Sequence, residues 1–362
     1  MLAKLGEVCL LKAGKFVSAN DISPEYNKGL YPCFGGNGIR GYVADYTHDG
    51  EFPLIGRQGA LCGNVNLASG KFHATEHAVV VQPKIEMNVH WLYYAINAMN
   101  LGQYATGAAQ PGLAVSKLET LSIEIPNISE QNKIAQTLYK VEQLVNFRKQ
   151  QLAKLDELVK AQFVEMFGDI NVNNKKWMTY PLGELCTIVR GGSPRPIEMY
   201  MGGNIPWIKI GDATTGENIY LNSTKEYIIQ EGVKKSRMIK AGSLIFANCG
   251  VSLGFARIIT FDGCIHDGWL AMEDIDEKLD KIFLLYSLNQ MTEYFRKTAP
   301  AGTQPNLNTN IMKMHRQIVP PMEMQKAFIS FVKCADRQKQ IVQQSLDKLE
   351  LMKKALMQEY FG

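Results

Sequence analysis

The chain has 362 residues, 46% of them hydrophobic and 20% charged, which is enough for two domains with buried cores and ordinary for a globular protein. Its formal net charge of +4 excludes a basic block that binds nucleic acid by charge alone. Residues 1–128 hold 9 Lys and Arg against 10 Asp and Glu, and residues 174–321 hold 17 against 14, so a DNA ligand would need positive charge from a partner as well.

We expect neither a membrane span nor a secretion signal. No run of about 18 apolar residues occurs, and the amino terminus lacks the charged and apolar regions of a signal peptide. The seven cysteines form no Cys-x-x-Cys pair. Such an odd, scattered set is typical of buried thiols in a reducing compartment, so the expected location is the cytoplasm.

Residues 1–128 form the first expected domain, which is rich in glycine and in short apolar runs. The runs at 53–56, 78–81 and 121–125 predict strands bounded by turns, and residues 91–99 predict a short buried helix.

The segment His73-Ala74-Thr75-Glu76-His77 matches the His-x-x-Glu-His pattern of one class of zinc proteases. That chemistry needs both histidines on one face of a helix. The Ala-Val-Val-Val run at 78–81 instead predicts a strand at this point. We therefore expect no metal site here, and metal content of the purified protein would test a metallohydrolase.

Residues 129–168 predict one long helix. Apolar residues recur at the a and d positions of five heptads, Pro126 lies just upstream, and Gly168 follows as a stop signal. The same pattern returns at 322–362, displaced by 194 positions and closed by Gly362. A polar linker at 169–180 separates the two halves.

Two equal heptad helices in one chain predict an intramolecular antiparallel pair. Its symmetric register sets Arg148 opposite Leu346, whereas a slip of one heptad sets Arg148 against Lys339 or Lys353, which like-charge repulsion disfavours. We expect the charged ends of these three side chains to stay in water. The predicted core of the helix pair comprises Ile134, Leu138, Val145, Leu152, Leu155, Val342, Leu346, Leu349, Leu356 and Tyr360.

Residues 181–321 form the second expected domain, because Leu5-Gly6-Glu7 recurs as Leu182-Gly183-Glu184. The runs at 243–246 and 257–261 predict strands, and residues 283–289 predict a short helix. The expected fold class is α+β, with two β-rich domains related by internal duplication and joined by two long helices that form an intramolecular antiparallel coiled coil.

The sequence carries no P-loop, dinucleotide fingerprint, methylation motif or paired Cys/His spacing. A chain of this length without a catalytic constellation is expected to bind and organise rather than to catalyse. Arg, Asn and Gln in glycine-flanked turns suit base edges and phosphates. The candidate DNA-binding residues are Asn37, Arg40, Arg57, Gln58, Gln110, Arg190, Ser193, Arg195, Lys209, Asn248, Gln304, Asn306 and Asn308.

Each of these residues could equally be an ordinary turn residue, and their repetition in two domains is what favours the functional interpretation. The alternative from another class is a coiled-coil scaffold with two protein-binding globular ends. A DNA-binding assay separates the two.

With these features the chain resembles the specificity subunit of Type I restriction–modification systems. The resemblance covers nearly the whole chain. It rests on the duplication, the Leu-Gly-Glu openings, the segments at 31–41 and 205–212, the Gln-Pro-x-Leu loops at 110–113 and 304–307, and the paired helices.

The resemblance implies target-recognition domains at 1–128 and 181–321, each reading one half of a split, asymmetric double-stranded DNA site. The helices would set the gap and dock two modification subunits, and restriction subunits would join the full complex. It implies no cofactor in this chain, with S-adenosylmethionine, ATP and Mg on the partners. About 37 helical residues span roughly 55 Å, which suits half-sites of about three to five base pairs placed about one helical turn apart.

Overall fold

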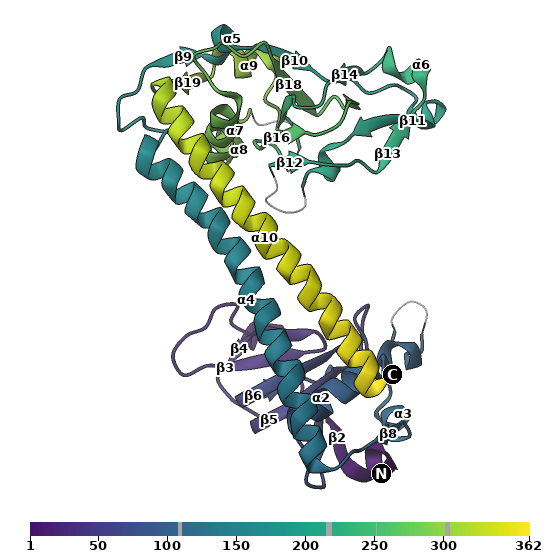
Figure 1. Cartoon of the computed structure of the whole chain (residues 1–362). Coiled ribbons are helices and arrows are strands. Elements are labelled where there is room, and N and C mark those ends of the chain that lie inside the picture. The colour runs from purple at the N-terminus through teal and green to yellow at the C-terminus, as the bar shows by residue number, and fades with distance from the viewer. Residues whose placement is uncertain (108–110, 215–218, 251, 301–304) are drawn as a thin grey trace. The chain divides into compact units, whose positions relative to one another are not determined.

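The computed structural model describes residues 1–107, 111–214, 219–250, 252–300 and 305–362. It divides into two compact units: unit 1 contains residues 1–149 and 344–362, and unit 2 contains residues 150–343. Two 40-residue helices, α4 (Ile128–Phe167) and α10 (Met322–Phe361), each contribute one part to each unit (Figure 1). None of the described helices is both long enough and apolar enough to cross a membrane.

Unit 1 is built on a six-stranded sheet. Its order is β2 (Cys9–Ala13), β7 (Ala78–Pro83), β5 (His48–Gly56), β6 (Val65–Ala74), β3 (Tyr31–Gly35), β4 (Gly38–Val43), and only the β3–β6 pair is parallel. A small sheet joins β1 (Leu2–Lys4) to β8 (Ser122–Glu124). The helices of this unit outside the long pair are α1 (Leu5–Val8), α2 (Val89–Ala98), α3 (Val115–Glu119) and the 3-10 turns at Ala19–Asp21 and Leu101–Tyr104.

The core of unit 1 follows the two-residue period of β7, an inner strand of the sheet. Along β7, Val79 and Val81 pack with α2, while Ala78 and Val80 pack on the opposite face with Phe72. A strand buried on both faces reads as a continuous apolar run, which is why this segment predicts a strand and not a helix. The predicted helix at 91–99 is confirmed as α2, and the run at 78–81 is confirmed as part of β7.

Unit 2 repeats this plan with more strands. One sheet has the order β10 (Thr187–Arg190), β18 (Trp269–Glu273), β15 (Leu244–Ala247), β16 (Ala256–Ile259), β12 (Tyr220–Leu221). A second has the order β13 (Glu226–Ile228), β11 (Met201–Ile208), β17 (Gly263–Ile265), β14 (Arg237–Ile239), and a third pairs β19 (Arg316–Ile318) with β9 (Thr179–Pro181). The expected linker at 169–180 therefore contains Thr179 and Tyr180 of a paired strand.

The helices of unit 2 outside the long pair complete the repeat. They are α5 (Leu182–Leu185), α6 (Gln230–Val233), α7 (Lys281–Gln290), α8 (Thr292–Thr298), α9 (Thr309–Met314) and the 3-10 turns at Ile197–Met199 and Ile210–Asp212. The predicted helix at 283–289 is confirmed as part of α7. It packs on the face of β15 that carries Leu244 and Phe246, as α2 does on β7 in unit 1.

Within each unit α4 and α10 run antiparallel. In unit 1, Glu142 Oε1 lies 2.7 Å from Lys353 Nζ, and Arg148 Nε donates to Ser345 Oγ at 3.1 Å. In unit 2, Lys339 forms an ion pair with Asp156 further along α4. Residue numbers thus rise on one helix as they fall on the other, which confirms the intramolecular antiparallel coiled coil.

The residues predicted for the helix-pair core differ in their burial. Ile134, Leu138, Val145, Val342 and Leu346 are buried, whereas Leu152, Leu155, Leu349, Leu356 and Tyr360 are half-buried. At the end of the pair in unit 2, the fully buried rings of Phe163 and Phe167 both pack edge-on against Phe328. Burial of each such ring contributes roughly 2–3 kcal/mol.

The three charged residues that interrupt the predicted heptads all have partners. Lys353 and Lys339 pair with acids on α4, and Arg148 bonds Ser345, which is adjacent to its predicted neighbour Leu346. Both lysine side chains are half-buried, and their ammonium groups form ion pairs that the heptad pattern alone did not predict. The ion pairs between α4 and α10 stabilise the observed register of the helix pair.

Two buried glutamines show the duplication at the level of single hydrogen bonds. Gln131 Nε2 donates to Pro126 O at 2.9 Å and its Oε1 accepts from Asn88 N at 2.9 Å. In unit 2, Gln325 Nε2 donates to Pro320 O at 2.8 Å and its Oε1 accepts from Asp280 N at 2.8 Å. Each glutamine ties the start of a long helix to the residue before the short buried helix.

We expect Gln325→Leu to destabilise unit 2 by about 3 kcal/mol. Gln325 is fully buried, and the change leaves the N–H of Asp280 and two carbonyls without partners. Urea unfolding followed by tryptophan fluorescence measures this, because Trp177, Trp207 and Trp269 all lie in unit 2. The exposed Gln338→Leu on the same helix serves as control and should change stability by less than about 0.5 kcal/mol.

His315 makes the stability of unit 2 sensitive to acid. Burial lowers the pKa of its imidazole from 6.5 to about 4. Below pH 6.5 the unfolded chain takes up a proton that the folded chain does not, so stabilisation present above pH 6.5 is lost as the pH falls towards 4. The free energy of unfolding should fall by about 2–3 kcal/mol more in the wild type than in His315→Gln between pH 7 and pH 4.5. If the free energy of unfolding falls equally in the two proteins, His315 is not the source of this acid sensitivity.

Candidate nucleic-acid interface

In unit 1 the candidate residues meet where the β3–β4 hairpin lies against the end of β5. A Cβ on Gly56 would lie 1.9 Å from the carbonyl oxygen of Gly36, so only glycine allows this approach. Asn37 lies in the hairpin turn, and its Oδ1 accepts from Asn64 Nδ2 at 2.6 Å. Arg40 lies in strand β4 and is exposed, whereas the sequence places it in a loop.

The turn after β5 carries Arg57 and Gln58. The N–H of Arg57 donates to His77 O at 3.0 Å, and its carbonyl accepts from Leu113 N at 2.9 Å. The buried Nε of Arg57 has no hydrogen-bond partner among the described residues. Gln58 is exposed and its backbone bridges to Gly112. Gln110 lies outside the described residues.

A carboxylate lies beside these residues. Glu76 Oε1 is 3.2 Å from His77 Nε2, and its other oxygen is buried without a hydrogen-bond partner in the described part of the chain. Burial raises the pKa of the Cys33 thiol, while Arg40 lowers it and Glu76 raises it, so both charges lie near this cysteine. The His-x-x-Glu-His segment runs from the end of β6 into a turn and is not helical.

In unit 2 three candidate residues converge on Asp267. Ser193 Oγ donates to Asp267 Oδ1 at 2.8 Å, and Arg195 Nη2 lies 3.6 Å from Asp267 Oδ2. Arg190, the last residue of β10, donates from Nε to the backbone carbonyl of Asp267 at 2.9 Å. The arrangement presents two guanidinium groups and a hydroxyl around one half-buried carboxylate.

His266 completes this cluster. Its Nδ1 accepts from Gly268 N at 2.9 Å, so the neutral ring carries its proton on Nε2, which lies 3.1 Å from Asp267 Oδ1. Burial lowers the pKa of His266, Asp267 opposes this, and Lys209, Arg195 and Arg190 lower it further. The ring therefore stays neutral near pH 7 and donates to the carboxylate.

The remaining candidates of unit 2 have varied surroundings. Asn248 is fully buried; its Nδ2 donates to Asn306 Oδ1 at 3.4 Å, and its Oδ1 has no partner among the described residues. Lys209 pairs with Glu226 at 2.6 Å and lies 5.1 Å from the Trp207 ring centroid. Asn308 caps α9 by accepting from Asn310 N and Ile311 N. Gln304 lies outside the described residues.

The two interfaces share one backbone frame. In unit 1 the N–H of Arg57 donates to His77 O, and its carbonyl accepts from Leu113 N. In unit 2 the N–H of Asn248 donates to Gly268 O at 3.0 Å, and its carbonyl accepts from Leu307 N at 2.8 Å. Arg57 and Asn248 therefore occupy equivalent positions. By the same equivalence Glu76 matches Asp267, and neither was among the DNA-binding residues expected from the sequence. The signal was available, since an acid stands before the corresponding strand in each half.

This fold, a duplicated β-rich domain with paired antiparallel helices and polar turns that gather at one place in each unit, defines a DNA specificity protein. Residues 1–157 and 174–351 match the family model of the Type I restriction modification DNA specificity domain. The chain belongs to that family.

Relatives agree with this assignment. A segment of 143 residues is 52% identical to the Type I restriction enzyme EcoprrI specificity subunit of Escherichia coli, covering 39% of this chain and only 36% of that relative. A putative type I restriction enzyme specificity subunit of Haemophilus influenzae is 26% identical over 324 residues, 84% of this chain and 80% of the relative. The crystal structure of the Type I system S subunit from M. genitalium has the same fold, with a TM-score of 0.62, 17% identity, and coverage of 100% of this chain and 96% of that one. The chain is therefore a DNA-binding specificity subunit, a class of subunit that is non-catalytic.

Proposed function

We propose that the chain reads a bipartite, asymmetric DNA site, with unit 1 addressing one half and unit 2 the other. The observation that carries this proposal is that the two units share the same backbone hydrogen bonds around Arg57 and Asn248 but carry different side chains there. Arginine stands at position 57 and asparagine at the equivalent position 248. Arg57 is half-buried and Asn248 is fully buried, so the shape and polarity at this place of the interface differ between the units, and the two half-sites should differ in sequence.

We further propose that α4 and α10 set the distance between the half-sites. A helix of 40 residues is about 60 Å long at 1.5 Å per residue. Major-groove contacts on one face of DNA repeat every 34–36 Å or so. Two readers on such helices suit half-sites of about three to five base pairs that flank a nonspecific spacer.

The helix pair would also dock partners. We propose two modification subunits, one for each half-site, with restriction subunits added in the full complex. S-adenosylmethionine, ATP and Mg would then be held by those partners, and the complex would act in the cytoplasm, where the chromosome is. Because this chain has only a small excess of basic residues, partners would supply part of the positive charge that attracts the DNA phosphates.

Mapping of methylated adenine in a host that expresses this chain with its cognate modification subunit tests the proposal. The expected result is one split motif with two different half-sites and a spacer of fixed length. A palindromic or uninterrupted motif would count against two independent readers.

A further inference from the structure

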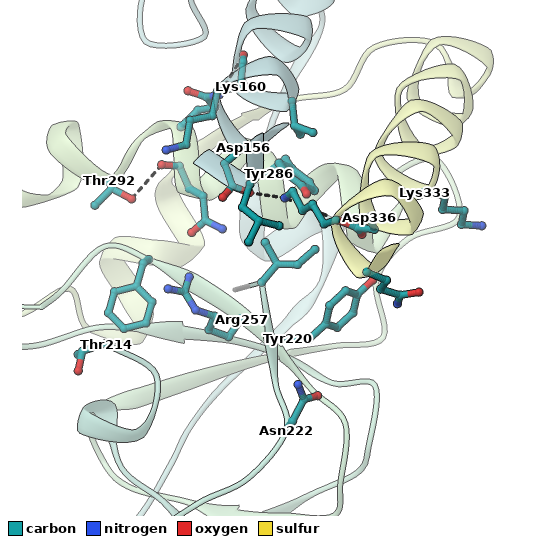
Figure 2. A pocket seen from close by; sticks show the side chains of 18 of the residues that line it. Asp156, Lys160, Thr214, Tyr220, Asn222, Arg257, Tyr286, Thr292, Lys333 and Asp336 are labelled. Carbon is teal, nitrogen blue, oxygen red and sulfur yellow. Dashed lines mark hydrogen bonds and ion pairs between the residues drawn. The ribbon is translucent and has the colours of Figure 1, made fainter. Parts of the chain in front are cut away.

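A groove of about 1180 Å³ lies within unit 2, between the long helices and the sheet that contains β12 and β16 (Figure 2). One wall is formed by residues 152–160 of α4 and 333–343 of α10. The other is formed by β12, β16, the end of α7 and the start of α8. The groove is separate from the cluster around Asp267, since none of the candidate DNA-binding residues lines it.

The lining of the groove is strongly cationic. Two acids, Asp156 and Asp336, face six basic residues: Lys160, Arg257, Arg296, Lys333, Arg337 and Lys339. Both acids lie at the helix wall, and Lys339 lies between them, paired with Asp156 and 3.9 Å from Asp336. Lys339 therefore neutralises part of the negative charge of the helix wall, and among the basic residues Arg296 pairs with Glu293 outside the lining at 2.9 Å.

Three of the cations, Arg257, Lys333 and Arg337, have different surroundings. The guanidinium of Arg257 lies 4.6 Å above the centre of the Phe255 ring and donates from Nη1 to Ala256 O, which fixes its plane. Lys333 and Arg337 lie one turn apart on α10; both are exposed and have no ion-pair partner among the described residues. They can contact a ligand without breaking an existing bond.

The chemistry of this lining suits phosphate better than protein. Besides the basic groups the lining includes the amides of Asn222 and Gln340 and the hydroxyl of Thr214. The side chains of Asn289, Gln290 and Thr292 also line it but already bond backbone atoms. Arg, Lys, Asn, Gln and Thr are the side chains that contact DNA phosphates. The cores of protein–protein interfaces are depleted in lysine, whereas three lysines line this groove, together with three arginines and the rings of Tyr220, Phe255 and Tyr286.

The segment between β15 and β16 connects the groove to the candidate nucleic-acid interface of unit 2. The connection from β15 to β16 carries Asn248 at its start, and Ser252 and Phe255 further along line the groove. We propose that the groove binds the sugar–phosphate backbone of the same duplex whose bases unit 2 reads, through sequence-independent contacts. This inference rests on the proposed function and adds a second DNA contact that is nonspecific and dependent on salt.

The double variant Lys333→Gln/Arg337→Gln tests the groove in the complex of the full chain with its modification subunit. Fluorescence anisotropy with a 40-base-pair duplex of random sequence, titrated at several salt concentrations, should give a log K against log[salt] slope that is shallower by about 2. The methylated motif should stay the same. The control Lys326→Gln/Lys348→Gln removes equal charge from exposed positions of α10 outside the groove and should leave the slope unchanged.

Three results would overturn the groove proposal: a wild-type slope in the groove variant, an equal change in the control, or loss of modification-subunit binding with an unchanged slope. The last would assign the groove to a protein partner. Failure of the proposed function has a different signature, because the wild type itself would then methylate no split motif, whatever the slopes of the variants.

Discussion

Asp267→Asn is expected to lower discrimination at one half-site by tenfold or more while raising affinity for random DNA. The carboxylate holds Ser193 and Arg195 by its side chain and accepts from His266, so its loss frees groups that we propose contact bases. Removing a negative charge next to the duplex also reduces repulsion of phosphates. Competition binding of specific against random duplexes, with methylation mapping, measures both effects.

Asp262→Asn is the matched control, because Asp262 is an exposed acid of unit 2 that pairs with Lys240. It should leave both quantities unchanged. Arg40→Ala should have its effect on the other half-site, since Arg40 lies in unit 1. An equal loss at both half-sites from Asp267→Asn would indicate a folding defect and contradict a role in positioning.

Lys353→Glu is expected to cost about 3 kcal/mol or more in unit 1. The change places a second carboxylate beside Glu142, which also accepts from Tyr94 Oη at 2.8 Å, in a half-buried part of the helix pair. The free energy of unfolding from denaturant titration measures the loss. Its magnitude should exceed that of a surface ion pair, which is below about 1 kcal/mol.

The swap Glu142→Lys/Lys353→Glu should recover much of this stability, because the opposite charges face each other again. Lys354→Glu, an exposed neighbour on α10, serves as control and should cost little. If the swap is as unstable as the single variant, Lys353 and Glu142 are not partners in solution, and the observed register is wrong.

The features that follow from local sequence periodicity were predictable. The heptads gave the two long helices and their antiparallel pairing, and the apolar runs gave α2, α7 and β7. The parallel β3–β6 and β11–β17 pairs were not foreseen, because their partners lie far apart in the chain and no local pattern marks them. The ion pairs of Lys339 and Lys353 could have been found by reading across the predicted register for acids.

The candidate site was only partly accessible from sequence. The equivalence of Arg57 and Asn248 was visible as matching turns after a strand, and shared backbone hydrogen bonds now support it. The role of Asn308 as a helix cap was not foreseen, because a polar turn residue looks the same whether it serves a ligand or a helix end. Glu76 was considered only as part of a metal motif and Asp267 was not among the candidates, yet Asp267 holds Ser193 and Arg195.

The most direct test of the account is the dependence of affinity on the distance between the two half-sites. Once the motif is mapped, duplexes that carry both half-sites are prepared with the spacer lengthened or shortened one base pair at a time, and the complex is titrated with each. Each added base pair turns the second half-site by roughly 35°, so a rigid helix pair predicts a sharp maximum at the natural spacer and a loss of at least tenfold two base pairs away. Equal affinity across the series would contradict the claim that α4 and α10 hold two readers at a set span.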